Sequence, residues 1–339
     1  MSVALRPHPY DAFATPSTPL PNKVGRVVLV VNPMSGNRRG AKAAAWAEPK
    51  LREAGVDVRV LRTERAGHAA ELAAGEDLAD VDAVVAVGGD GTLHEVVNGL
   101  MRRGDSADVR ARVALGVIPA GSGNTVAYST KAYSAETALE QILRGHVRNF
   151  DVIELTPPGG ATAAAAPLYA VNVVGWAMPS KIMKTANDLR CLGFGALYNT
   201  AIYMFILTNK TFRGKITYVT DADETKTIAG QIALLSVNTT VHIGSRTPVS
   251  PEAKIDDGLL DLTVVTKSNV AHNMRTMALA ERGKHPGRRG ITQAKVKEVL
   301  LEPGDGRLTG PGSVNVDGEM TGYAPVRVRV VPAAFKLLC

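Results

Sequence analysis

Short apolar runs alternate with longer alanine-rich stretches in the first half of the chain, and no other feature limits the fold as strongly. The apolar runs are rich in valine and lie at 27–32, 56–61, 83–87 and 113–118. The longer stretches, most of them rich in alanine, are amphipathic at helical spacing and lie at 41–54, 67–74, 93–101 and 134–143. Strands that alternate with helices are typical of a parallel sheet with helical crossovers. A near-continuously apolar run such as 83–87 indicates a strand that helices cover on both faces. We therefore predict an α/β domain.

The pattern changes after about Asn149. Longer strand candidates with alternating residues follow, at 168–174, 215–220, 228–237, 259–265, 294–301 and 326–331. Helical material interrupts them around 180–208 and 270–282, and the glycine- and alanine-rich stretch 156–167 reads as an exposed connector. The second half is therefore predicted to be a mainly antiparallel β domain. The predicted division is a flexible arm over 1–22, an α/β domain over 23–148 and a β-rich domain over 149–339.

Composition restricts the class of protein. The 339 residues are 45% hydrophobic and 21% charged, with a mean hydropathy of +0.01, which excludes a mainly disordered chain. The net charge of +7 and the pI of about 9.4 favour anionic partners. Two cysteines, Cys191 and Cys339, fit a reducing compartment, and the first 22 residues lack the apolar run of a secretory signal, so we expect a cytoplasmic location. No helix-turn-helix or zinc-finger pattern supports nucleic-acid binding.

One uncharged segment, Cys191–Asn209, approaches the length of a membrane span. Asn199, Thr200 and Thr208 dilute it with polar groups, so a helix buried in a domain, or one that touches lipid from the protein surface, is the more economical interpretation. The basic stretch 281–290 is read first as a solvated loop, with a membrane surface or a phosphate as the alternative.

Three glycine-rich turns each follow a predicted strand of the first half. They are NPMSGNRRG at 32–40, GGDGTLHE at 88–95 and PAGSGN at 119–124. In a doubly wound sheet, ligands bind at the carboxyl ends of the strands, so the three turns are predicted to converge. Their backbone N–H groups suit phosphate, and Arg38 and Arg39 add positive charge. No GxxxxGK[ST] motif is present, which excludes an ordinary nucleotide P-loop.

The middle turn carries the strongest chemical signal. Asp90 sits among Gly88, Gly89 and Gly91, which let the backbone approach a ligand closely. Its carboxylate is placed either to hold Mg²⁺ or to accept a proton from an attacking hydroxyl; a plain turn aspartate is the alternative.

Several neighbouring polar residues have a structural role as an alternative to a role in ligand binding. Thr92 and Glu95 have the spacing of a capping box, so Glu95 is either a helix cap or a ligand contact. In the third turn, Asn124 is read as the cap of the next helix. After the second strand, Thr63 is a candidate nucleotide contact, whereas His68 is read as a helix-start residue.

The motifs NPMSG, GGDGTLHEVVNGLM and PAGSGN, in this order, resemble the catalytic domain shared by diacylglycerol, sphingosine and ceramide kinases. IDDGLLDLTVV (255–265) and VNVDGEM (314–320) resemble later elements of that family, so the resemblance runs from about residue 25 to 332. EVVNGLMRR followed by PAGSGN is most similar to the sphingosine kinase branch. The resemblance implies an α/β nucleotide-binding domain, a β-sandwich-like lipid-binding domain, and ATP with Mg²⁺ between them.

The resemblance also implies site residues. Asp90 would be the catalytic acidic residue and a ligand of Mg²⁺, and Asp317, Gly318 and Glu319 would close the site from the second domain. The residues that would line the nucleotide are Asn32, Pro33, Met34, Thr63, Gly89, Gly91, Glu95, Gly121, Ser122, Gly123 and Arg190.

Two departures bear on the substrate. Where sphingosine kinases have an aspartate for the amine of the long-chain base, this chain has Met183, and a second family arginine falls on Ala196. An ammonium group without a partner in an apolar pocket costs several kcal/mol, which weakens sphingosine as the acceptor.

We therefore predict an ATP-dependent lipid kinase acting on a sphingoid base or a diacylglycerol-like acceptor, with peripheral membrane association. A soluble-metabolite kinase of the NAD kinase or phosphofructokinase type and a catalytically silent lipid- or nucleotide-binding protein stay as alternatives. The oligomeric state is left open, with a homo-oligomer among the choices.

Overall fold

The computed structural model describes residues 16–160, 166–182, 207–243, 247–266, 269–304 and 309–339. The chain divides into two compact units. Unit 1 contains residues 1–152, 254–257 and 332–339, and unit 2 contains residues 153–253 and 258–331. The division places the last eight residues with the first part of the chain. The domain boundary predicted near residue 149 stays a prediction.

The core of unit 1 is a parallel sheet. Its strands follow the order β3 (Asp57–Arg62), β2 (Arg26–Val31), β4 (Ala83–Gly88) and β5 (Ala114–Pro119). The end of β15 (Val326–Leu338) extends this sheet, because Lys336 and Leu337 pair in parallel with Ala114 and Leu115 of β5. All six residues of β4 are buried, as expected for a central strand covered on both faces. The predicted α/β domain with a parallel sheet is confirmed.

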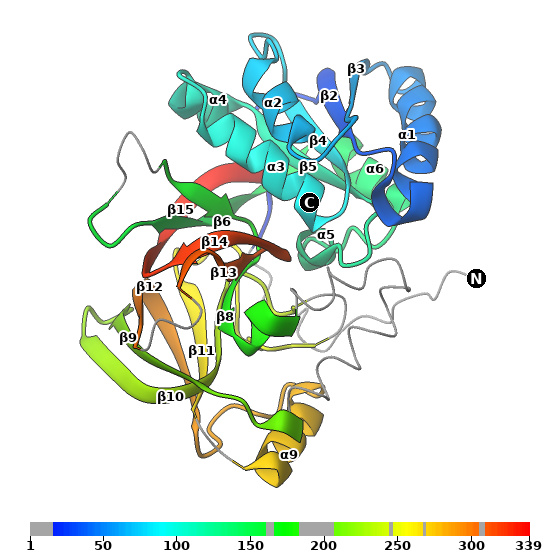
Figure 1. Ribbon diagram of the computed structural model, residues 1–339. Coiled ribbons are helices and arrows are strands. Elements are labelled where there is room, and N and C mark those ends of the chain that lie inside the picture. Colours follow the sequence, from blue (N-terminus) through cyan, green and yellow to red (C-terminus); the bar gives the residue numbers. More distant parts are fainter. Residues whose placement is uncertain (1–15, 161–165, 183–206, 244–246, 267–268, 305–308) are drawn as a thin grey trace. The chain divides into compact units, whose positions relative to one another are not determined.

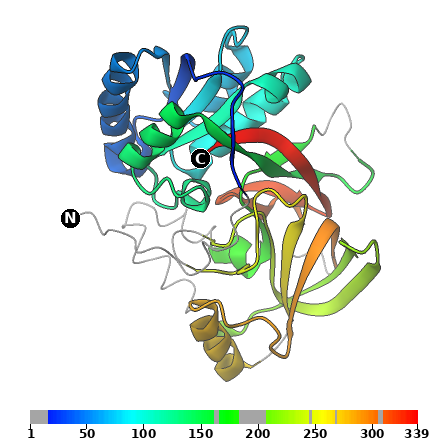
Figure 2. The same cartoon turned by 180° about the vertical axis from the view of Figure 1, so that it is seen from behind.

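Helices cover both faces of this sheet. Figures 1 and 2 show α1 (Ser35–Glu53) and α6 (Ala135–Arg144) on one face, with α2 (His68–Gly75) and α3 (Asp90–Met101) on the other. Each matches a helix predicted from the alanine-rich stretches. Two short helices were not predicted: α4 (Ser106–Arg112) and α5 (Thr125–Ser129).

A buried ion pair attaches the short segment 254–257 to unit 1. The guanidinium of Arg148, 8% exposed, lies 3.0 Å from the carboxylate of Asp256, 3% exposed. The backbone nitrogen of Asp151 also donates to the carbonyl of Ile255 at 2.8 Å. A buried charge without its partner is costly, so these contacts hold the segment in place.

Unit 2 is built from antiparallel strands. The main sheet runs in the order β14, β13, β8, β10, β11, β12. β9 pairs with the first half of β10, over 225–232, and with β12, over 296–303, so the sheet folds back around its own core. The predicted antiparallel, β-sandwich-like second half is confirmed. The bounds are β6 His146–Thr156, β7 Leu168–Ala170, β8 Val173–Ala177, β9 Phe212–Thr220, β10 Thr225–Asn238, β11 Leu260–Thr266, β12 Ile291–Pro303, β13 Gly310–Val316 and β14 Glu319–Ala324. The short β1 (Thr18–Pro19) pairs with β6 in unit 1.

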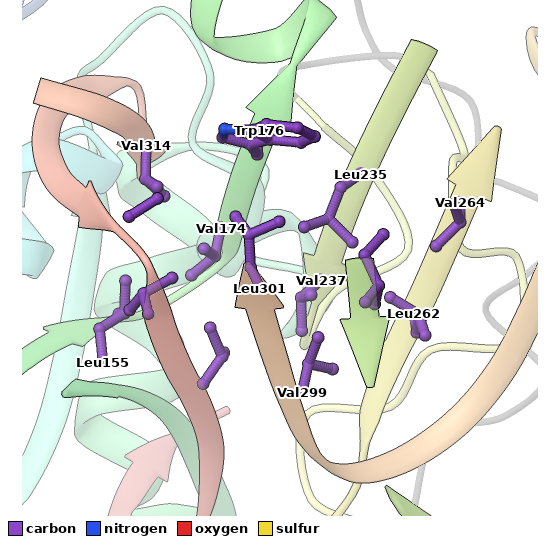
Figure 3. Packing of buried hydrophobic residues seen from close by; sticks show 14 of the residues in the cluster. Leu155, Val174, Trp176, Leu235, Val237, Leu262, Val264, Val299, Leu301 and Val314 are labelled. Atoms are coloured by element: carbon purple, nitrogen blue, oxygen red, sulfur yellow. The ribbon is translucent and has the colours of Figure 1, made fainter. Parts of the chain in front are cut away.

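Alternation along the strands of unit 2 sorts apolar from polar residues. Val174 and Trp176 of β8 lie beside Leu235 and Val237 of β10, and all four side chains point into the apolar core (Figure 3). The residues between them point to the other face. There, Gly175 pairs with Ser236 on one side and with Asn315 on the other.

One helix of unit 2 connects β11 to β12. This is α9 (Val270–Ala280), which begins at the N-cap Asn269, whose side chain accepts a hydrogen bond from the backbone nitrogen of His272 at 2.8 Å. Among the described residues, no helix combines the length and the apolar character needed to cross a membrane. The uncharged segment Cys191–Asn209 lies outside the described residues up to residue 206.

Candidate functional site

The first glycine turn lies between β2 and α1. Gly36, Asn37 and Arg38 all have left-handed backbones, with φ of 55°, 60° and 66°. A Cβ at Gly36 would lie 2.0 Å from the carbonyl oxygen of Ala120, so only glycine fits against the third turn here. Asn32 shapes the start of the turn, because its Oδ1 accepts from the backbone nitrogen of Met34 at 3.1 Å.

Arg39 joins the first turn to the third. Its Nε donates to the carbonyl oxygen of Gly36 at 2.9 Å, and a terminal nitrogen donates to that of Gly121 at 2.7 Å. The sequence suggested that this arginine supplies charge for phosphate, whereas the structure shows that its guanidinium links two glycine turns.

The second turn lies directly against the third. A Cβ at Gly121 would come within 2.4 Å of the Cα of Gly89, so the two backbones pass each other at a distance that excludes side chains. Gly91 differs, since a Cβ there meets nothing within 4 Å. Gly89 therefore approaches another backbone closely, whereas Gly91 is an ordinary residue in the first turn of α3. The close approach of these glycines to a ligand stays a prediction.

Asp90 binds the segment that follows the third turn. One carboxylate oxygen accepts from the backbone nitrogen of Thr125 at 2.9 Å, and the other accepts from that of Val126 at 3.2 Å. These amides begin α5, so Asp90 caps a helix that starts 35 residues later in the chain. A Cβ at Gly123 would lie 2.8 Å from the same carboxylate.

Asn124 was expected to cap the following helix, and it occupies the N-cap position of α5, but its side chain makes no capping hydrogen bond there. Its Oδ1 accepts from the backbone nitrogen of Gly121 at 2.8 Å, and its Nδ2 donates to the carbonyl of Gly121 at 3.0 Å. Its own backbone is left-handed, with φ of 56°. Asn124 thus closes the PAGSGN loop on itself and leaves Ser122 exposed at the tip.

Glu95 contacts a helix other than its own. Its two carboxylate oxygens accept from the backbone nitrogens of Gly67 and Ala69, at 2.9 and 3.0 Å, at the start of α2. The capping box expected with Thr92 is not formed, because α3 begins at Asp90 and places Thr92 inside the helix. Glu95 instead joins the second turn to the loop after β3, where Thr63 is buried.

Unit 1 therefore brings the three glycine turns together, as the sequence predicted. They meet at the carboxyl ends of β2, β4 and β5, where ligands bind in open α/β sheets. At this end of the sheet, Met34 is 64% exposed, and Ser122 is also exposed.

In unit 2, Asp317 holds a turn between β13 and β14. Its carboxylate accepts from three consecutive backbone nitrogens, those of Val171, Asn172 and Val173, at 2.7, 2.9 and 2.9 Å. Asp317 and Gly318 have positive φ, 50° and 94°. Glu319, the first residue of β14, is exposed. Arg190, Met183 and Ala196 lie outside the described residues.

The acids of the predicted site thus share one behaviour that sequence reasoning missed. Asp90, Glu95 and Asp317 each use both oxygens to accept hydrogen bonds from backbone amides far away in the chain. The one signal in the sequence was the capping-box spacing of Glu95, which predicted a cap of its own helix, α3. In the structure Glu95 accepts from amides at the start of α2. Within the described residues, no group of three or more His, Cys, Asp or Glu side chains forms a ready metal centre.

Comparison with known proteins finds two matching families and several similar proteins. The family described as "Diacylglycerol kinase catalytic domain" matches residues 26–155, and the one described as "YegS C-terminal NAD kinase beta sandwich-like domain" matches residues 172–339. The chain is 28% identical over 310 residues to a diacylglycerol kinase of Bacillus subtilis (strain 168), covering 88% of this chain and 91% of the relative. It is 31% identical over 227 residues to sphingosine kinase 2 of Homo sapiens, covering 63% of this chain and 33% of the relative.

A solved structure agrees with the fold. The crystal structure of a diacylglycerol kinase from Bacillus anthracis str. Sterne superimposes with a TM-score of 0.71 at 25% identity, covering 94% of this chain and 98% of that one. The α/β unit with its three glycine turns is thus a diacylglycerol kinase catalytic domain. The chain belongs to the family of lipid kinases that contains the diacylglycerol kinases and sphingosine kinases.

Proposed function

We propose that this protein transfers the γ-phosphoryl group of ATP to the hydroxyl of a diacylglycerol-like lipid. The observation that carries the proposal is the meeting of three glycine turns around Asp90 at the carboxyl end of the sheet. Phosphoryl transfer depends mainly on positioning and on neutralising charge, and closely packed turns of this kind suit that task.

The turns of unit 1 would hold the phosphates. Gly89 and Gly121 lie so close that no side chain fits between the two backbones. Arg39 keeps the first turn against the third through two backbone carbonyls, so the frame is fixed before ATP arrives. Met34 and Ser122, both exposed, would contact the nucleotide.

Asp90 fits the role of a magnesium ligand. Its two oxygens accept from the amides of Thr125 and Val126, and these hydrogen bonds orient the carboxylate. An ionised carboxylate offers about four lone-pair sites. Mg²⁺ in kinases is commonly held by one or two carboxylates together with phosphates of the substrate. Bound there, Mg²⁺ would supply neutralisation of the charge that develops on the phosphates.

The transfer step is an in-line displacement. The lipid hydroxyl oxygen forms a bond to the γ-phosphorus, the bond from that phosphorus to the β–γ bridging oxygen breaks, and ADP leaves with the electron pair. The hydroxyl proton passes to a carboxylate, and we assign this proton transfer to Asp90 of unit 1. Asp317, Gly318 and Glu319 are further site residues that we propose from the family resemblance.

An uncharged acceptor suits the chain better than a sphingoid base. Met183 stands where an acid would pair with an ammonium group, and an apolar side chain there gives a charged amine no partner. The relative from Bacillus subtilis, matched over 91% of its length, is named a diacylglycerol kinase. We place this activity in the cytoplasm at a membrane surface.

A lipid panel tests the proposal. The protein would be incubated with labelled ATP, Mg²⁺ and detergent micelles containing diacylglycerol, monoacylglycerol, ceramide or sphingosine, and the labelled product identified. We expect phosphatidic acid from diacylglycerol and little product from sphingosine. Labelled NADP from added NAD would instead support a soluble-metabolite kinase, and ATP binding without any product would support a silent binding protein.

A further inference from the structure

Helix α9 and the loop after it concentrate positive charge in unit 2. Residues 270–290 contain five arginines and lysines and one glutamate, so their net charge is 5 − 1 = +4, against +7 for the whole chain. Arg275, Lys284, Arg288 and Arg289 are exposed, and none of the four has an ion-pair partner within the part of the chain that the structure describes. More than half of the net charge of the protein therefore lies in 21 consecutive residues.

The exposed side of α9 is unusually apolar. The exposed positions of the helix recur at the spacing of one face and are Ala271, Met274, Arg275 and Ala278. Glu281 and Arg282, directly after the helix, are also exposed. Met274 is 38% exposed and is one of few large apolar side chains in the described residues with such exposure. A solvated helix face normally carries charged and polar residues of both signs, whereas the exposed face of α9 has alanine, methionine and arginine, and its one acid is Glu281, directly after the helix.

The inward side of α9 shows the opposite character. The Nε2 of His272 and the Oδ1 of Asn273 are buried without a hydrogen-bond partner among the described residues, and the Nδ2 of Asn273 donates to Asn209 at 2.9 Å. Only Ala280 in the helix is fully buried. Burial against the protein therefore does not explain the exposed apolar residues of α9, which are Ala271, Met274 and Ala278.

The loop after α9 is held in a fixed shape. His285, 3% exposed, lies between its basic residues, and its Nε2 is 2.9 Å from the carbonyl oxygen of Val249 and 3.0 Å from the amide nitrogen of Gln293. Gly283, Gly287 and Gly290 turn the chain with φ of 63°, 72° and 77°. In both views α9 and this loop stand out from the end of the unit 2 strands (Figures 1 and 2).

We propose that these residues form a docking surface for an anionic phospholipid bilayer. The surface, here called the basic patch, consists of Ala271, Met274, Arg275 and Ala278 of α9 with Arg282, Lys284, Arg288 and Arg289 of the loop. A helix with small apolar residues and a flank of cations is suited to lie at the headgroup level, and basic residues near an anionic surface each add to the attraction. The inference extends the proposed function, because a diacylglycerol-like substrate resides in a bilayer.

Vesicle binding tests the basic patch without using catalysis. The full chain would be sedimented with phosphatidylcholine vesicles and with vesicles that also contain phosphatidylglycerol. We expect binding only to the anionic vesicles, weakening as salt is raised. The variant Arg288→Glu/Arg289→Glu should bind at least about tenfold more weakly. Met274→Glu should also weaken binding, and Met274→Trp should show a blue shift of its emission with anionic vesicles.

A matched control separates the patch from net charge. Lys23→Glu/Arg112→Glu changes the net charge by the same four units at exposed positions of unit 1. It should leave vesicle binding within about twofold of the unmodified chain, the scale of an exposed substitution. An equal loss in both double variants, the absence of binding by the unmodified chain, or tighter retention on duplex DNA than on anionic vesicles would each overturn the proposal.

The kinase assay keeps the two hypotheses apart. A short-chain diacylglycerol dissolved in detergent needs no docking, so Arg288→Glu/Arg289→Glu should phosphorylate it at the unmodified rate. Loss of turnover on that soluble substrate in the patch variant would contradict the docking role. No turnover by the unmodified chain, with patch-dependent vesicle binding intact, would reject the proposed function and leave the docking surface standing.

Discussion

The carboxylate of Asp90 lies 2.9 Å from the backbone nitrogen of Thr125 and accepts its hydrogen bond. The middle glycine turn is thereby connected to the helix that follows the third turn, across 35 positions of sequence. The residue proposed to hold Mg²⁺ therefore also builds the site, and its substitution has two effects that can be measured separately.

Replacing Asp90 with Asn should reduce both activity and stability. The amide keeps one acceptor oxygen, and its NH₂ group faces an N–H of Thr125 or Val126, which costs about 1–3 kcal/mol of unfolding free energy. Lipid-dependent ATP turnover should fall at least about a hundredfold. Urea unfolding and labelled-ATP assays would measure the two effects, with Asp108→Asn, an exposed acid of α4, as the control. Near-normal turnover in folded Asp90→Asn would reject the assignment.

Replacing Glu95 with Gln should loosen α2 and leave ATP affinity nearly unchanged. The substitution removes one of the two acceptors for the amides of Gly67 and Ala69. Hydrogen exchange of the α2 amides should accelerate, whereas the Kd for an ATP analogue should change by less than about twofold. Glu71→Gln, on the exposed side of the same helix, is the matched control. A large loss of ATP affinity with α2 protection intact would instead show that Glu95 contacts nucleotide.

Substitutions of Asp317 and Glu319, at the β13–β14 turn, should affect stability and activity differently. Asp317→Asn disturbs three amide hydrogen bonds and should lower the free energy of unfolding by about 1–3 kcal/mol. Glu319→Gln alters an exposed residue and should change it by no more than about 0.5 kcal/mol. If Glu319 belongs to the site, its variant should nevertheless lose lipid kinase activity. A stable, fully active Glu319→Gln would remove it from the site.

A methyl group distinguishes the glycines that approach another backbone from the one that does not. Gly121→Ala would place its Cβ 2.4 Å from the Cα of Gly89, so the turns must move apart and ATP affinity should fall. Gly91→Ala has open space and lies in a helix, where alanine is favoured by up to about 1 kcal/mol. Thermal unfolding and binding of an ATP analogue would compare the two. Equal behaviour of both variants would contradict the close approach.

Buried His285 should make stability depend on pH. Burial lowers the pKa of its imidazole below the ordinary value of 6.5, so the folded state resists protonation that the unfolded state accepts. Stability is therefore complete above about pH 6.5 and declines as the pH falls towards the folded pKa, by at most about 1.4 kcal/mol per pH unit. Urea midpoints between neutral and mildly acidic pH would show the slope. His285→Gln should flatten it; an unchanged slope would assign the effect to other groups.

Local patterns in the sequence predicted much of the fold. Continuous valine runs identified β2 and β4, and helical spacing identified α1, α3 and α6. Helix α5 escaped notice because its five residues carry no periodic signal, and its cap is Asp90, far away in the chain. The β13–β14 hairpin escaped for a similar reason, since Asp317 stabilises it through amides near residue 172.

The positions of the three glycine turns were predicted better than the roles of the side chains around them. Glycine spacing located the three turns and their convergence, because these depend on strand ends. The sequence alone does not reveal which donors surround a carboxylate. Glu95 therefore was expected to cap its own helix or bind nucleotide, and in the structure it holds α2. Arg39 was expected to face phosphate, and it binds two carbonyls.

The pairing of β9 with both β10 and β12 determines the order in which the protein can fold. Residues 214–220 find one partner strand immediately after them, but their second partner, 296–303, follows about eighty residues later. The sheet of unit 1 also contains a strand pair between residues far apart in the sequence, because Lys336 pairs with Ala114. Contacts so distant along the chain slow folding, because long loops must close first. Both units are therefore completed only when β12 and β15 have been synthesised, and until then the edges of their partner strands stay unpaired.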